Sequence, residues 1–95
     1  METFSQTQIM ESIILQKDFS KRYIQEFMTF VTKIKSFVYF ESDDKRIINA
    51  KSIIGLLSLN YKKGDKFNII VANFFSYDEL LTDIEKILNF FEKAD

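Results

Sequence analysis

The chain of 95 residues has no cysteine and no histidine, and it has only two glycines. Without cysteine it can form no disulfide and no thiolate metal site. Without histidine it has no imidazole base, no imidazole metal ligand and no residue that can carry phosphohistidine. Two glycines are too few for a glycine-rich phosphate-binding loop. The composition therefore predicts no metal, no cofactor and no catalytic residues, so we do not expect an enzyme.

Neither sign of charge dominates, because 13 basic and 14 acidic residues leave a formal net charge of −1. Duplex-binding proteins normally carry a basic surplus, and the lysines here are interleaved with acids, which indicates a solvated surface rather than direct nucleic-acid binding. Apolar runs of about five residues fall well short of the roughly 20 that a membrane span needs. The N-terminus lacks a basic region followed by an apolar core, so we expect no secretory signal and a cytoplasmic protein.

What the chain does have is apolar and aromatic content. It is 46% hydrophobic and 28% charged, with eleven phenylalanines and four tyrosines. These proportions are typical of a globular protein, and large rings provide much buried area in a short chain. We expect one domain over residues 1–95.

Hydrophobic periodicity predicts seven elements. Strands are expected at residues 6–16, 36–41, 45–49 and 66–72, with a turn at residues 42–44. Helices are expected at residues 20–34, 52–59 and 77–92. In the first strand Ile9 and Ile13 should face one side and Met10 and Ile14 the other, although Glu11 leaves room for a bulge.

Capping residues mark where the helices begin. Ser20 is a candidate N-cap of the first helix, Ser52 of the second and Ser76, with Glu79, of the third. Asn60 can close the second helix in the left-handed conformation. The expected core includes apolar residues from both long helices and the last strand: Phe27, Val31, Val71, Leu81, Ile84 and Leu88.

The element order is strand, helix, strand, strand, helix, strand, helix. Amphipathic helices with half-polar strands predict an α+β domain, with helices on one face of a mostly antiparallel sheet. The pattern alone does not separate a ferredoxin-like arrangement from other folds of this class.

The segment at residues 49–59 indicates which fold of the α+β class the chain adopts. Residues 49–59 read Asn-Ala-Lys-Ser-Ile-Ile-Gly-Leu-Leu-Ser-Leu. This closely resembles the segment around the regulatory serine of HPr, the phosphocarrier of the bacterial sugar phosphotransferase system (PTS), which typically reads N-x-K-S-[IL]-[ML]-G-[VL]-[ML]-S-L. The resemblance covers about residues 8–91. It implies an open-faced β-sandwich of order βαββαβα, in which three helices cover one face of a four-stranded antiparallel sheet.

The resemblance places Ser20 where HPr has its phosphorylated histidine. The family's histidine is followed by Ala-Arg-Pro, and here Lys21, Arg22 and Tyr23 follow, so the arginine is kept while the histidine and proline are lost. A serine phosphoester is too stable to pass its phosphoryl group on readily, so carrier activity is not carried over. Ser20 is then simply a helix cap, or it keeps an anion-binding role with Arg22.

The regulatory motif, by contrast, is intact at Ser52. In Gram-positive relatives a dedicated HPr-serine kinase phosphorylates this serine, and the product is a corepressor for a catabolite-control transcription regulator. The Crh branch (catabolite repression HPr) likewise lacks the histidine and keeps the serine. The resemblance makes Ser52 a candidate phosphorylation site whose charge Lys51 could neutralise. The alternative is that Ser52 only caps its helix.

The family's apolar docking patch corresponds to Ile53, Ile54 and Leu57. A short helix buries one side only, so at least one of the three should be exposed, while the others could be core. We therefore expect a regulatory binding module that docks onto protein partners through these residues with Ser20, Arg22 and Lys51. The alternatives are a degenerate HPr copy with an unrelated interaction role and an atypical phosphocarrier.

Overall fold

The computed structural model describes residues 7–73 and 75–92. It contains seven elements in the expected order: β1 (Thr7–Ile14), α1 (Lys21–Val31), β2 (Phe37–Glu41), β3 (Ile47–Asn49), α2 (Ile53–Leu57), β4 (Lys66–Asn73) and α3 (Tyr77–Glu92). The expected α+β class is therefore confirmed.

The four strands form one antiparallel sheet in the order β1-β4-β2-β3. β1 pairs with β4 in unbroken register from Thr7 opposite Asn73 to Ile14 opposite Lys66, so the bulge considered for β1 is absent. Two segments far apart in the sequence thus lie side by side in the sheet.

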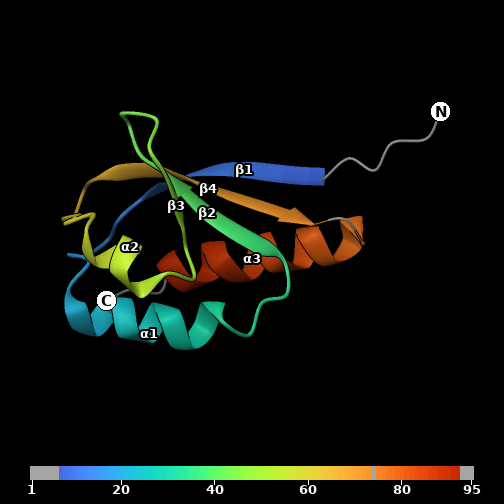
Figure 1. The fold of residues 1–95 in the computed structure, drawn as a ribbon, viewed down its shortest axis with the longest axis horizontal. Helices are drawn as coiled ribbons and strands as arrows, with labels where there is room; N and C mark the ends of the chain where they lie inside the picture. Colours follow the sequence, from blue (N-terminus) through green and yellow to red (C-terminus); the bar gives the residue numbers. More distant parts are fainter. Residues whose placement is uncertain (1–6, 74, 93–95) are drawn as a thin grey trace.

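In the part of the chain that the structure describes, α1, α2 and α3 lie on one side of the sheet, and the other side carries no helix (Figure 1). The core fills the space between the helices and the sheet. At its centre the ring of Phe27 on α1 lies 5.4 Å from the rings of Phe40 on β2 and Phe91 on α3. Such aromatic pairs stabilise a small core beyond the area they bury.

The helix caps match the sequence. The Ser20 and Ser52 hydroxyls accept hydrogen bonds from the first turns of α1 and α2, and Ser76 accepts one from the backbone of Glu79. Asn60 has a φ of 53°, the left-handed conformation expected after α2. α1 is shorter than expected, because Thr32 closes it with hydrogen bonds from its backbone N–H to the carbonyls of Met28 and Phe30.

Two of the six expected core residues need correction. Phe27, Val31, Val71 and Ile84 are buried, but Leu81 is 42% exposed and Leu88 is half-buried against the core. The buried face of α3 instead runs through Leu80, Asp83, Ile84, Ile87 and Phe91. The buried face of α3 therefore differs from the face that its apolar residues predict. As a result, the Asp83 carboxylate lies inside the protein.

Among the residues that the structure describes, no helix combines the length and apolar character required to cross a bilayer.

Candidate functional site

The site is built where α1 and α2 pack against each other. A surface hollow of about 270 Å³ lies between the first turn of α1 and the end of α2. Ser20 and Lys21 line it from α1, and Leu57 and Asn60 line it from α2 and the residues that follow. The structure thus brings the two sequence-predicted segments, the Ser20 region and the Ser52 helix, into one surface.

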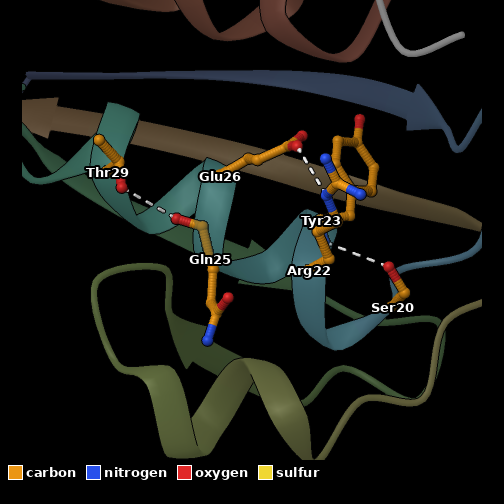
Figure 2. A network of polar contacts seen from close by, with 6 residues as sticks. All are labelled: Ser20, Arg22, Tyr23, Gln25, Glu26 and Thr29. Atoms are coloured by element: carbon orange, nitrogen blue, oxygen red, sulfur yellow. Dashed lines mark hydrogen bonds and ion pairs between the residues drawn. The ribbon is translucent and has the colours of Figure 1, made fainter.

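Ser20 is committed to capping α1. Its hydroxyl accepts a hydrogen bond of 3.2 Å from the backbone N–H of Tyr23 (Figure 2), and its carbonyl accepts one of 2.8 Å from Ile24. Its side chain is nonetheless exposed. A serine in this position satisfies backbone donors that would otherwise lack a partner in the helix.

The loop after α2 fixes the backbone around Ser20. The N–H of Phe19 donates to the carbonyl of Tyr61 at 3.0 Å, and the N–H of Lys63 donates to the Asp18 carboxylate at 2.8 Å. The left-handed turn at Asn60 directs the chain towards these contacts. The start of α1 and the end of α2 are therefore held together by one backbone hydrogen bond and one bond to the Asp18 side chain.

Arg22 points into solvent and is 90% exposed. Its Nε lies 3.8 Å from a Glu26 carboxylate oxygen one turn later (Figure 2). An exposed pair of this kind contributes little to stability. The guanidinium can therefore exchange Glu26 for an anionic group on a partner at small cost.

Tyr23 has a structural role that the sequence pattern did not indicate. Its ring is buried, stacks on Phe90 at a centroid distance of 5.6 Å and carries the Lys17 ammonium 4.4 Å from its centroid. Its hydroxyl finds no hydrogen-bond partner among the residues that the structure describes. Burial, with a smaller effect of Glu26, raises the pKa of Tyr23 to about 12. The residue at the family's proline position is thus part of the core.

Ser52 caps α2 in the same manner as Ser20 caps α1. Its hydroxyl accepts a hydrogen bond of 3.2 Å from the N–H of Gly55, and its carbonyl accepts one of 3.0 Å from Leu56. The side chain is half-buried. With only five residues, α2 has a weak dipole, so most of the favourable interaction with an added phosphate must come from outside the helix.

Lys51 does not take the position expected of it. Its Nζ donates hydrogen bonds to the carbonyl oxygens of Ile34 at 2.5 Å and Ser36 at 2.9 Å, so it is directed away from the Ser52 hydroxyl and into the protein. Burial lowers the pKa of Lys51, and the Asp83 carboxylate opposes that shift. The expectation that Lys51 neutralises a phosphate on Ser52 does not fit this geometry.

The three apolar residues expected to dock partners are all exposed: Ile53 by 44%, Ile54 by 78% and Leu57 by 43%. Leu56, in the same helix, is fully buried and anchors it. None of the three exposed residues is therefore core, and each presents a large apolar side chain to solvent, with Leu57 lining the hollow.

No group of three or more acidic, cysteine or histidine side chains that could hold a metal ion occurs within residues 7–73 and 75–92.

Comparison with known protein families gives one match. The model of the family described as "PTS HPr component phosphorylation site" matches residues 9–89, most of the chain. No curated protein sequence is similar enough to match.

Solved structures with this fold include a protein described as HPr-C-His from Thermoanaerobacter tengcongensis, with 21% identity, a TM-score of 0.65, and coverage of 94% of this chain and 99% of that one. The phosphocarrier protein HPr from Bacillus anthracis gives 20% identity, a TM-score of 0.70, and coverage of 92% and 98%. A histidine-containing phosphocarrier protein from Mycoplasma gives 12% identity, a TM-score of 0.63, and coverage of 93% and 100%. At these identities the likeness concerns the fold.

Proposed function

Because this chain belongs to the HPr family, whose members are PTS phosphocarriers rather than enzymes, we propose that it is a cytoplasmic regulatory binding module related to that system. In this proposal residues 1–95 act as one HPr-like domain that docks onto protein partners and passes on no phosphoryl group. The chain has no histidine to form the labile P–N bond that phosphoryl transfer requires.

The observation that carries the proposal is the shared surface at the hollow. Ser20 and Leu57 line the same depression, and Ile54, one turn before Leu57 in α2, is 78% exposed. An apolar patch next to an exposed cation favours a partner that offers an apolar pocket and acidic side chains. Lys21, which is exposed and lines the hollow with Leu57, supplies this cation, whereas Arg22 lines a different hollow that shares only Ser20 with this one.

Ser52 is the proposed switch. A phosphate on its hydroxyl would add negative charge beside Ile53 and Ile54. Because Lys51 is held by the carbonyls of Ile34 and Ser36, the counter-charge has to come from the partner, through a charge-assisted contact with its arginine or lysine. Phosphorylation would then change partner affinity rather than the fold. The family candidates for these partners are an HPr-serine kinase and a catabolite-control transcription regulator.

The test is phosphorylation of the purified chain by an HPr-serine kinase with ATP, followed by intact-mass measurement. We expect one phosphate on the unmodified protein and on a Ser20→Ala control, and none on Ser52→Ala. Binding of the product to the transcription regulator is then measured by calorimetry, where Ile54→Lys should weaken it. If the kinase leaves the unmodified protein unlabelled, or labels it and Ser52→Ala equally, the switch is wrong.

A degenerate copy without phosphorylation is the second candidate. It is favoured by the capping bond from Gly55, which alone accounts for a serine at position 52. Under this function the docking surface is retained while Ser52 stays unmodified in cells. Mass spectrometry of the native protein for phosphoserine distinguishes the two.

A further inference from the structure

The face of the sheet opposite the helices (Figure 1) exposes several large apolar side chains. Side chains alternate along each strand. Phe67, Ile69 and Val71 of β4 belong to the core, so the intervening residues of β4 and their cross-strand partners form the open face. From β1 to β3 these residues are Gln8, Met10, Ser12, Ile14, Lys66, Asn68, Ile70, Ala72, Phe37, Tyr39, Glu41, Ile47 and Asn49.

Solvent-exposed faces of antiparallel sheets normally carry polar residues, but seven of these thirteen residues are apolar or aromatic. Met10 is 54% exposed, Ile14 51%, Phe37 46% and Ile47 56%. Large exposed apolar areas of this kind mark interaction surfaces.

Residues that pair across neighbouring strands form rows on this face, and two of these rows contain no charged residue. In one row Met10 and Tyr39 flank Ile70, and in the next Gln8 and Phe37 flank Ala72. Ile70 and Ala72 are only 9% and 1% exposed, although they point away from the core. In each row a small residue of β4, which is covered by its neighbours, lies beside a larger aromatic residue of β2. The surface of the face is therefore low over β4 and high over β2.

The strand residues of this face include two charged side chains, and they have opposite signs. Lys66 lies on β4 and Glu41 on β2. Glu41 accepts a hydrogen bond of 3.0 Å from Asn68, and Asn68 in turn accepts one of 3.0 Å from Ser12. Ser12, Asn68 and Glu41 thus form a hydrogen-bonded polar row beside the two uncharged rows.

We infer that the open face is an interface with a second copy of this chain, formed by packing the two sheets face to face. In this dimer a two-fold axis lies between the two sheets, parallel to the strands and centred between β4 and β2. It places β4 of one copy over β2 of the other. It sets Phe37 over Ala72 and Tyr39 over Ile70 of the other copy, so large residues meet small ones. It also brings Lys66 within reach of Glu41, twice by symmetry.

The size of the face limits the area that the association can bury. With strands about 4.8 Å apart and a rise of about 3.4 Å per residue, the face offers on the order of 500 Å² per copy. The dimer would bury on the order of 1,000 Å², near the lower limit for specific interfaces. The structure therefore favours a weak dimer, with a dissociation constant on the order of 10–100 μM.

This inference is independent of the proposed function. Ser20 and Ser52 cap α1 and α2, which lie on the opposite side of the sheet (Figure 1). A dimer through the open face therefore leaves both docking surfaces accessible and makes the module bivalent.

The test is sedimentation equilibrium of the full chain from about 5 μM to about 1 mM, a range that spans the expected dissociation constant. We expect the average mass to rise from 11.3 kDa towards twice that value. Met10→Lys, which places an unpaired charge in an apolar row, should raise the dissociation constant about tenfold or more. The matched control is Leu81→Lys, because Leu81 is a similarly exposed apolar residue on α3 and should leave the association unchanged.

A charge exchange tests the symmetry. Lys66→Glu and Glu41→Lys should each weaken the dimer by about threefold at low salt, and the double variant should restore it. Circular dichroism verifies that each variant is folded. A protein that remains at 11.3 kDa throughout the range contradicts the inference. So does association that survives Met10→Lys in a folded variant or is lost in folded Leu81→Lys.

Discussion

The hydroxyl of Ser36 donates a hydrogen bond of 2.6 Å to the carboxylate of Asp83 and so joins the residue before β2 to the middle of α3. Both side chains are buried, with exposures of 0% and 8%. The same hydroxyl accepts a hydrogen bond of 3.0 Å from the Asn73 amide, and the Ser36 carbonyl accepts one from Lys51. This buried cluster ties β2, β4 and α3 to the segment that leads into α2.

Ser36→Ala should therefore destabilise the protein by more than a surface substitution. It removes the hydrogen bonds that Ser36 makes to the buried Asp83 carboxylate and to the Asn73 Nδ2 group, at a cost of about 1–3 kcal/mol. Urea unfolding followed by circular dichroism measures the change. The control is Thr82→Ala, which removes an exposed hydroxyl bonded within α3 and should shift the free energy by about 0.5 kcal/mol or less. Equal midpoints for the two variants would contradict the cluster's role.

Gly55→Ala should destabilise α2, because a Cβ at this position would lie 2.7 Å from Cγ2 of Ile48 on β3. Such overpacking costs about 1–3 kcal/mol. The double variant with Ile48→Ala removes the opposing methyl group, so the two effects should be less than additive. Gly64→Ala is a contrasting control, since no atom lies within 4 Å there and its φ of 93° is the only source of strain. Strict additivity of the Gly55 and Ile48 substitutions would refute the close approach.

We expect the free energy of unfolding to fall at alkaline pH because of the buried Tyr23 hydroxyl. Burial raises the pKa of Tyr23 from 10.0 to about 12. A raised pKa means that the folded state favours the protonated form. The contribution of protonated Tyr23 to the free energy of unfolding is therefore complete below pH 10 and is lost between pH 10 and about 12. The measurement is the urea midpoint across this range, compared with Tyr23→Phe, which should show a smaller decline. Identical pH profiles would show that Tyr23 is not the group responsible.

Incubation with phosphoenolpyruvate and the first enzyme of the PTS should give this protein no acid-labile phosphate, because position 20 is a serine. Ser20→His restores the nucleophile and should recover some transfer. Adding Tyr23→Pro to complete the family motif should reduce stability, since it removes a buried ring and the N–H that bonds to Ser20. Robust labelling of the unmodified chain would overturn the proposal that it is not a carrier.

The sequence by itself determined the number, order and type of the elements. Local signals are strong at these places: Ser20, Ser52 and Ser76 cap the helices, and β4 alternates cleanly from Phe67 to Val71. The absence of histidine alone excluded phosphohistidine chemistry, and the segment around Ser52 identified the family. These conclusions depend on side-chain chemistry and local backbone preference, which are readable along the chain.

Only the tertiary structure decided which face of α3 is buried and where the Lys51 side chain points. The apolar stripe of α3 is wide enough to fit more than one rotation, and the buried bond between Ser36 and Asp83 selects the one that exposes Leu81. Lys51 precedes Ser52 in sequence, but the carbonyls of Ile34 and Ser36 bind its ammonium from a distant segment. These partners lie far apart along the chain, so the periodicity of a single element carries no information about them.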